Sequence, residues 1–231
     1  MTRILITGGT GLIGKHLTKK LTEKNYEVLI LTRSPKNENE FQWNINEKYI
    51  DEKVFKNLDY IIHLAGAGIA DKRWTDKRKQ EIIKSRVHST NLLLQKVKEH
   101  QVNLKGFIAA SAIGFYGAKT TDKIFEETDT SANDFLGKVC KLWETASLQF
   151  EKENIQTAIL RTGIVLTENG GALAKMKTPI ISPLGTGNQY LPWIHIDDLC
   201  NMYIKSIEDN LAGIFNAVAP EHHTSKSFSK A

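Results

Sequence analysis

The sequence predicts an α/β fold: a doubly wound parallel sheet with helices on both faces and a small, incomplete C-terminal lobe. Short apolar runs alternate along the chain with longer amphipathic stretches, which is typical of a mostly parallel sheet. The first run, Ile4–Ile6, leads directly into the glycine-rich segment Thr7–Gly14 and then into a helical pattern. The length of 231 residues is sufficient for one substantial core.

Strands are predicted from runs of apolar, often β-branched residues bounded by polar or glycine-containing segments. They cover residues 4–6, 27–32, 41–43, 59–64, 104–110, 158–160 and 213–216. Helices are predicted from longer periodic stretches, at residues 11–24, 75–100, 132–152 and 196–209. The second helix has a leucine face at Leu92–Leu94. Asp197 and Asp198 open the last helix, where the helix dipole favours negative charge.

Composition argues against several classes of protein. The formal net charge is +5, and Lys and Arg alternate with Glu and Asp, without a basic block that would indicate nucleic-acid binding. No apolar run approaches the roughly 18 residues of a membrane span. The N-terminus does not resemble a signal peptide, and Cys140 and Cys200 have no metal-type spacing. We expect a cytoplasmic monomer or homodimer that binds a small molecule, without metal, nucleic acid or membrane.

The glycine-rich segment has the spacing of a dinucleotide site. Gly8 allows a tight turn, Gly11 lets the backbone approach a pyrophosphate, and Gly14 lets the helix pack on the strand. The N–H groups that open the following helix would then face the phosphates. The expected cofactor contacts here are Thr7, Gly8, Gly9, Thr10, Gly11, Leu12, Ile13 and Gly14.

The end of the second strand indicates which dinucleotide binds. An NAD site usually places an acidic residue there to hold the ribose 2′-hydroxyl. This chain has Thr32, Arg33 and Ser34 instead, and a guanidinium suits a 2′-phosphate. NADP is therefore the expected cofactor, with NAD as the second choice.

A second group of small residues follows the strand at residues 59–64. Ala65 and Gly66, with Leu64 before them, lie where open α/β sheets bind ligands, and they leave room for the cofactor. Residues 1–166 are thus expected to form the cofactor-binding domain. Residues 167–231 are expected to carry parts of a substrate lobe, interleaved with the last strand and helix of that domain.

Four motifs give the chain a family resemblance. They are Thr7–Gly14, His63–Gly66, Ser111 with Phe115–Gly117, and Arg161–Gly163. With them the chain resembles the extended short-chain dehydrogenase/reductase superfamily, in its epimerase/dehydratase branch. This resemblance implies a Rossmann-type fold and an NAD(P)-dependent oxidoreductase or epimerase. Further expected cofactor contacts are Arg86, which lies with Lys84 and Ser85 on the long helix, Cys140 and Arg161.

Further segments resemble an atypical epimerase-like subfamily of NADP-binding proteins. They include Arg73–Thr75, Ser85–Val87, Ser111–Gly117 and Pro192–Asp198. Members of the subfamily are longer, and Thr224–Ala231 has the composition of a helix cap and first turn that then stops. Because one helical turn is unstable alone, either this tail is disordered or the chain is a fragment, and we favour a chain truncated at its C-terminal end.

The residues that carry the superfamily's chemistry are missing. Its pattern has a Ser or Thr, a Tyr acid/base, and a Lys four residues after that Tyr. The corresponding positions are Ala112, Leu136 and Cys140. Cys140 has two interpretations, a thiol acid/base or a small residue packed beside the cofactor.

Other groups can take over the missing chemistry. Ser111 and Tyr116 carry hydroxyls for a substrate carbonyl, and His195 can shift protons at neutral pH. Glu127 lies in a loop where a carboxylate can face the cleft. Gly170–Gly171 and Gly185–Gly187 suit mobile loops near the substrate.

The sequence supports two functions. One is an NADP-dependent oxidoreductase or epimerase acting on a small, nucleotide-linked substrate. The other is a protein that binds NADP(H) without turnover.

Overall fold

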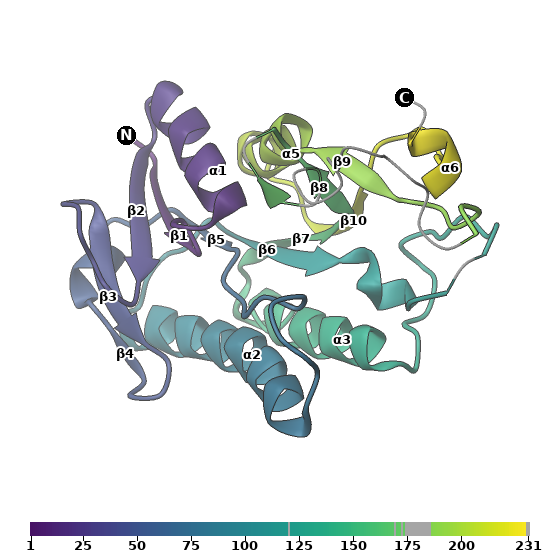
Figure 1. The fold of residues 1–231 in the computed structure, drawn as a ribbon. Helices are drawn as coiled ribbons and strands as arrows, with labels where there is room; N and C mark the ends of the chain where they lie inside the picture. Colours follow the sequence, from purple (N-terminus) through teal and green to yellow (C-terminus); the bar gives the residue numbers. More distant parts are fainter. Residues whose placement is uncertain (120, 169, 172, 174–185, 230–231) are drawn as a thin grey trace.

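A computed structural model describes residues 1–119, 121–168, 170–171, 173 and 186–229 (Figure 1). The strands are β1 (Arg3–Thr7), β2 (Glu27–Thr32), β3 (Glu40–Asn44), β4 (Tyr49–Ile50), β5 (Tyr60–His63), β6 (Gly106–Ala112), β7 (Gln156–Thr162), β8 (Ile164–Leu166), β9 (Trp193–His195) and β10 (Gly213–Ala217). The helices are α1 (Leu12–Glu23), α2 (Asp76–Glu99), α3 (Phe135–Ser147), α5 (Ile196–Glu208) and α6 (Ser225–Phe228). Short 3-10 helices lie at η1 (Glu52–Phe55), η2 (Ile113–Tyr116) and η3 (Glu151–Glu153).

Eight strands form one sheet in the order β10-β7-β6-β5-β1-β2-β3-β4. Every neighbouring pair is parallel except β3 with β4. The predicted doubly wound α/β fold is confirmed. The sequence reasoning missed β4 and the separate parallel pair of β8 and β9, because two- and three-residue strands have too little periodicity to be recognised.

Two apolar cores cover the two faces of the sheet. Ile4 and Ile6 point to the face covered by α1 and α5, while Leu5 points to the face covered by α2 (Figure 1). This alternation follows from the two-residue period of a strand. Because the central strands are buried on both sides, they read as continuous apolar runs in the sequence. The late elements α5 and β10 belong to these same layers.

The direction of winding reverses beside β1, which pairs with β2 on one side and β5 on the other. The loops that follow β1 and β5 therefore meet at the carboxyl edge of the sheet, where open α/β folds bind ligands. Gly8 has φ +73°, and a Cβ on it would lie 3.0 Å from the backbone nitrogen of Ala65. Only glycine fits this close approach without strain.

A buried histidine fixes the two loops to each other. His63 Nδ1 lies 2.6 Å from Thr7 Oγ1, which also accepts a hydrogen bond from the backbone N–H of Ala65 at 3.2 Å. On the other side of the ring, Nε2 lies 3.1 Å from Ser89 Oγ of α2. The Ser89 hydroxyl donates to backbone carbonyls of its own helix. It therefore accepts from His63, which fixes a neutral ring with the proton on Nε2.

The environment of His63 opposes a second proton. The ring is fully buried, and this burial, with a smaller effect of the Arg86 charge, lowers its pKa to about 3. The unfolded chain binds a proton near the ordinary histidine pKa of about 6.5. Between these two values the unfolded state takes up more protons, so the free energy of unfolding falls as the pH falls.

His63→Gln tests this linkage, because an amide can keep both hydrogen bonds but cannot titrate. From pH 7.5 to 5.0, wild type should lose about 2 kcal/mol of unfolding free energy through His63, which the variant should not lose. Urea denaturation at both pH values measures the difference. An equal pH dependence in the two proteins would contradict the assignment.

Candidate functional site

The glycine loop and the start of α1 form a cradle of backbone groups. A turn is closed by the hydrogen bond from Gly11 N to Gly8 O at 3.0 Å, and a Cβ on Gly14 would lie 2.3 Å from Gly8 O. Gly11 caps the helix with no side-chain hydrogen bond, and the first turn carries no acidic residue. The helix start thus presents backbone N–H groups and a positive dipole end without a side-chain cap, which suits an anion. The eight expected residues, Thr7 to Gly14, lie at the end of β1, in this loop and in the first turn of α1.

The end of β2 lies at the same edge of the sheet. The register of β1 and β2 pairs Thr7 with Leu31, so Thr32, Arg33 and Ser34 follow immediately beside the glycine loop. Arg33 is exposed and forms no ion pair with any residue that the structure describes. Its guanidinium is thus available to a ligand.

The loop after β5, with Leu64, Ala65 and Gly66, borders the same edge from the other side. Arg86 of α2 packs against it, and a Cβ on Gly66 would lie 2.9 Å from Arg86 Cζ. The guanidinium donates from Nη1 to the carbonyls of Ala67 and Ile82, each at 3.1 Å. The glycine loop, residues 32–34 and residues 64–66, all expected to contact the cofactor, therefore lie together at the carboxyl edge of the sheet.

Ser111 and Arg161 belong to a buried ion-pair cluster. Arg161 donates from Nε and Nη2 to both carboxylate oxygens of Glu144, each at 2.9 Å. Ser111 donates to the same carboxylate at 2.6 Å. Arg161 Cζ also lies 3.5 Å from the ring centroid of Phe115. These contacts give Ser111 and Arg161 structural partners, and the substrate and cofactor contacts expected for them stay predictions.

Tyr116 connects this cluster to open space. Its hydroxyl accepts from Arg161 Nη1 at 2.8 Å and lies 2.7 Å from Asn216 Oδ1. Glu127 is held nearby, because its carboxylate accepts from the backbone N–H of Asn216 at 2.7 Å. Tyr116 is thus oriented from two sides.

The positions of the missing superfamily groups are apolar. Leu136 lies 3.4 Å from where a Cβ on Gly114 would be, and Cys140 packs with Phe115 and Tyr116. Burial, with the neighbouring Glu144 charge, raises the pKa of the Cys140 thiol to about 11. The thiol is protonated at neutral pH, which favours the packing interpretation of Cys140 over a thiol acid/base.

His195 lies at the start of α5. Its Nδ1 accepts from the backbone N–H of Asp197 at 3.3 Å, so the ring caps the helix. Hydrogen bonds from Lys20 and His16 lower the pKa of Asp197 to about 2. His195 therefore has a structural partner, and it does not line the cavity beyond Tyr116.

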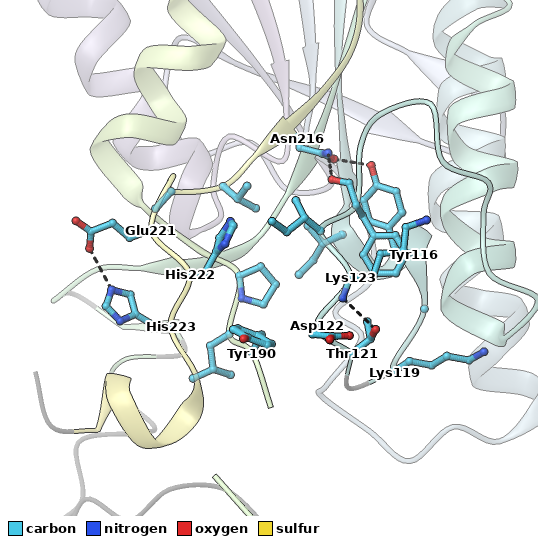
Figure 2. A pocket seen from close by; sticks show the side chains of 18 residues that line it. Tyr116, Lys119, Thr121, Asp122, Lys123, Tyr190, Asn216, Glu221, His222 and His223 are labelled. Carbon is cyan, nitrogen blue, oxygen red and sulfur yellow. Dashed lines mark hydrogen bonds and ion pairs between the residues drawn. The ribbon is translucent and has the colours of Figure 1, made fainter. Parts of the chain in front are cut away.

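A cavity of about 340 Å³ opens beyond Tyr116 (Figure 2). The loop after η2 forms one wall, with Lys119, Asp122 and Lys123. The segments around residues 190–192 and 216–223 form the other, with Glu221, His222 and His223. Lys123 pairs with Asp129, and His223 pairs with Glu221. No sequence pattern connects these segments, so the sequence reasoning missed all four basic residues. It found only Tyr116 among the residues that line this cavity.

The two expected glycine loops, at Gly170–Gly171 and Gly185–Gly187, lie only partly within the described residues. A Cβ on Gly171 would lie 3.1 Å from Leu12, which places this residue beside the start of α1. Gly185 of the second loop lies outside the described residues. Within the described ranges no group of acidic, His and Cys side chains could hold a metal, and no helix is long and apolar enough to cross a membrane.

Comparisons with known proteins agree with this architecture. The model of the NAD dependent epimerase/dehydratase family matches residues 4–217. The epimerase family protein YfhF of Bacillus subtilis (strain 168) is 36% identical over 237 residues, which cover 98% of this chain and 77% of YfhF.

Two solved structures are similar in fold and sequence. The human epimerase family protein SDR39U1 (isoform 2), solved with NADPH, has a TM-score of 0.87 and 26% identity, covering 99% of this chain and 78% of that one. A nucleoside-diphosphate sugar epimerase from Corynebacterium glutamicum has a TM-score of 0.88 and 33% identity, covering 99% of this chain and 49% of that one.

Glu144→Gln tests the ion-pair cluster. The change leaves the Arg161 charge buried without its carboxylate, which should lower the free energy of unfolding by ~3–5 kcal/mol. The matched control is the double change Glu144→Met with Arg161→Met, which removes both charges and should cost less than Glu144→Gln alone. Urea denaturation at pH 7 measures both, and a Glu144→Gln protein of wild-type stability would contradict the role of the pair.

Proposed function

The chain belongs to the NAD dependent epimerase/dehydratase family of the extended short-chain dehydrogenase/reductase superfamily, and we propose that it binds NADP(H) and acts on a small, nucleotide-linked substrate. The family is NAD(P)-binding. Our proposal adds the choice of NADP, the substrate class and the residues that bind them.

The observation that carries the cofactor proposal is the uncapped start of α1 beside Arg33. A Cβ on Gly8 or Gly14 would crowd backbone atoms, and the helix start has no side-chain cap, so this segment fits a pyrophosphate. Arg33 suits the 2′-phosphate that distinguishes NADP from NAD. The NADPH in the structure of human SDR39U1 supports the same choice.

The proposed substrate site is the cavity beyond Tyr116. Lys119 and His222 on its two walls would favour the phosphates of a nucleotide-linked substrate. The sugar-nucleotide activity named for the C. glutamicum relative supports this class. Of the three hydroxyl and imidazole candidates, only Tyr116 lines the cavity. Its hydroxyl is engaged by Asn216, the Glu126 carbonyl and Arg161, so the Tyr116 ring is proposed to form part of the wall that contacts the substrate.

When bound, the dinucleotide supplies the hydride chemistry. The protein's part is to bind the phosphates at α1, to hold the Tyr116 hydroxyl in place through Arg161 and Asn216, and to enclose the substrate. Ser111, Cys140 and His195 have no proposed proton-transfer role.

The second candidate is NADP(H) binding without turnover. It is favoured by one observation, the apolar and protonated groups where the superfamily has its Tyr and Lys. Titration with NADPH, followed by a panel of carbonyl compounds and nucleoside-diphosphate sugars monitored at the NADPH absorbance, separates the two functions. Binding with turnover supports the enzyme, binding without turnover on any substrate supports the second candidate, and no binding contradicts both.

Arg33→Asp tests the cofactor choice. A carboxylate would repel the 2′-phosphate and accept a hydrogen bond from a 2′-hydroxyl, so affinity should shift from NADPH toward NADH by about 100-fold or more in the ratio of Kd values. Lys36→Asp, a matched charge reversal three residues later, should leave this ratio within about threefold. Fluorescence titration measures both, and an unchanged ratio in Arg33→Asp would exclude the assignment of Arg33.

A further inference from the structure

Arg86 is a buried cation without a carboxylate partner among the described residues. It is 8% exposed, and burial lowers its pKa. The equally buried Arg78 and Arg161 both pair with acidic side chains. Arg86 donates from one nitrogen, Nη1, to two carbonyls, and no described partner accepts from Nε or Nη2.

The position of this guanidinium connects the cofactor edge with α3. It packs against the Cα of Gly66 on one side, and on the other its Cζ lies 5.0 Å from the ring centroid of Trp143. Trp143 follows Cys140 by three residues, so the two share a face of α3. The Arg86 charge also opposes the rise in the pKa of the Cys140 thiol. Arg86 thus brings a positive charge next to the position where the superfamily pattern has its Lys.

We infer that Arg86 supplies from α2 the cation that the superfamily takes from α3, and that it binds the ribose and phosphate oxygens of the nicotinamide half of NADP(H). This inference rests on the proposed function. A guanidinium has only donors, and Nε and Nη2 of Arg86 have no described protein acceptor, so both can donate to acceptor oxygens of a ligand. A buried charge is costly unless it is paired, and the carbonyls and Trp143 satisfy only part of it. Oxygens of a ligand would complete the pairing.

The reciprocal arrangement explains Cys140. A Lys at this position would place a second cation beside Arg86, and like charges at short range in a buried site repel strongly. A small neutral side chain avoids this repulsion. The absence of a Lys on α3 is therefore linked to the buried Arg on α2, because the site can hold only one of these two cations without repulsion.

Arg86→Met is the first test, because methionine fills a similar volume without charge. The dissociation constants of NADPH and of adenosine 2′,5′-bisphosphate, which lacks the nicotinamide half, are measured by fluorescence and calorimetry. NADPH should bind ~10- to 100-fold more weakly, since a charge-assisted contact is lost. Adenosine 2′,5′-bisphosphate should bind within about twofold of wild type, which also shows that the variant is folded.

Matched variants complete the design. Lys84→Met removes an exposed cation from the same helix and should change neither affinity. Arg86→Lys should keep most of the NADPH affinity. Adding Cys140→Lys to Arg86→Met should restore NADPH affinity to within about fivefold of wild type, whereas Cys140→Lys alone should lower stability through repulsion.

The outcomes separate this inference from the proposed function. If wild type binds neither ligand, the proposed function fails. If wild type binds both and Arg86→Met weakens neither, or weakens both equally, the inference is overturned. If the double variant binds adenosine 2′,5′-bisphosphate normally but gains no NADPH affinity over Arg86→Met, the replacement of the α3 cation by Arg86 is overturned.

Discussion

The hydrogen bonds of His63 are the constraint on which the arrangement of the ligand edge depends. One ring joins the end of β1, the loop after β5 and the middle of α2 through Thr7, Ala65 and Ser89. Each of these elements carries part of the proposed cofactor site. A buried neutral imidazole with a fixed proton has one donor and one acceptor, and both are used to hold these elements together. The close approach of Gly8 to Ala65 follows from this placement.

Two buried arginines show how differently the fold treats positive charge. Arg161 is neutralised within the protein, by a bidentate pair with Glu144, and it serves to hold Ser111 and Tyr116. Arg86 has carbonyls and an aromatic ring but no described carboxylate. A protein that buries a charge with incomplete pairing gives up stability at that point, which is typical of sites that are completed by a ligand. The first arginine is thus part of the framework and the second part of the proposed site.

The chemistry beyond the cofactor depends on segments that are distant in the chain. Tyr116, which lines the cavity, is held by hydrogen bonds to Arg161 and Asn216. The basic side chains on the two walls of the cavity are about a hundred residues apart in the chain (Figure 2). This division is common in open α/β folds, where the sheet holds the cofactor and loops at its carboxyl edge select the substrate. Here it separates a cofactor edge built by β1, β2 and β5 from a cavity built by later loops.

The sequence alone determined the longer strands of the sheet, its main helices, the glycine cradle and the position of Arg33. Each of these depends on residues that are neighbours in the chain and on the periods of helix and strand. It also identified Ala112, Leu136 and Cys140 as a departure from the superfamily pattern. Only the tertiary structure decided the partners of Ser111, Arg161 and His195, the protonation of Cys140, and the cavity. Hydrogen-bond partners, burial and cavities depend on contacts between residues far apart in the chain, and no local pattern encodes them.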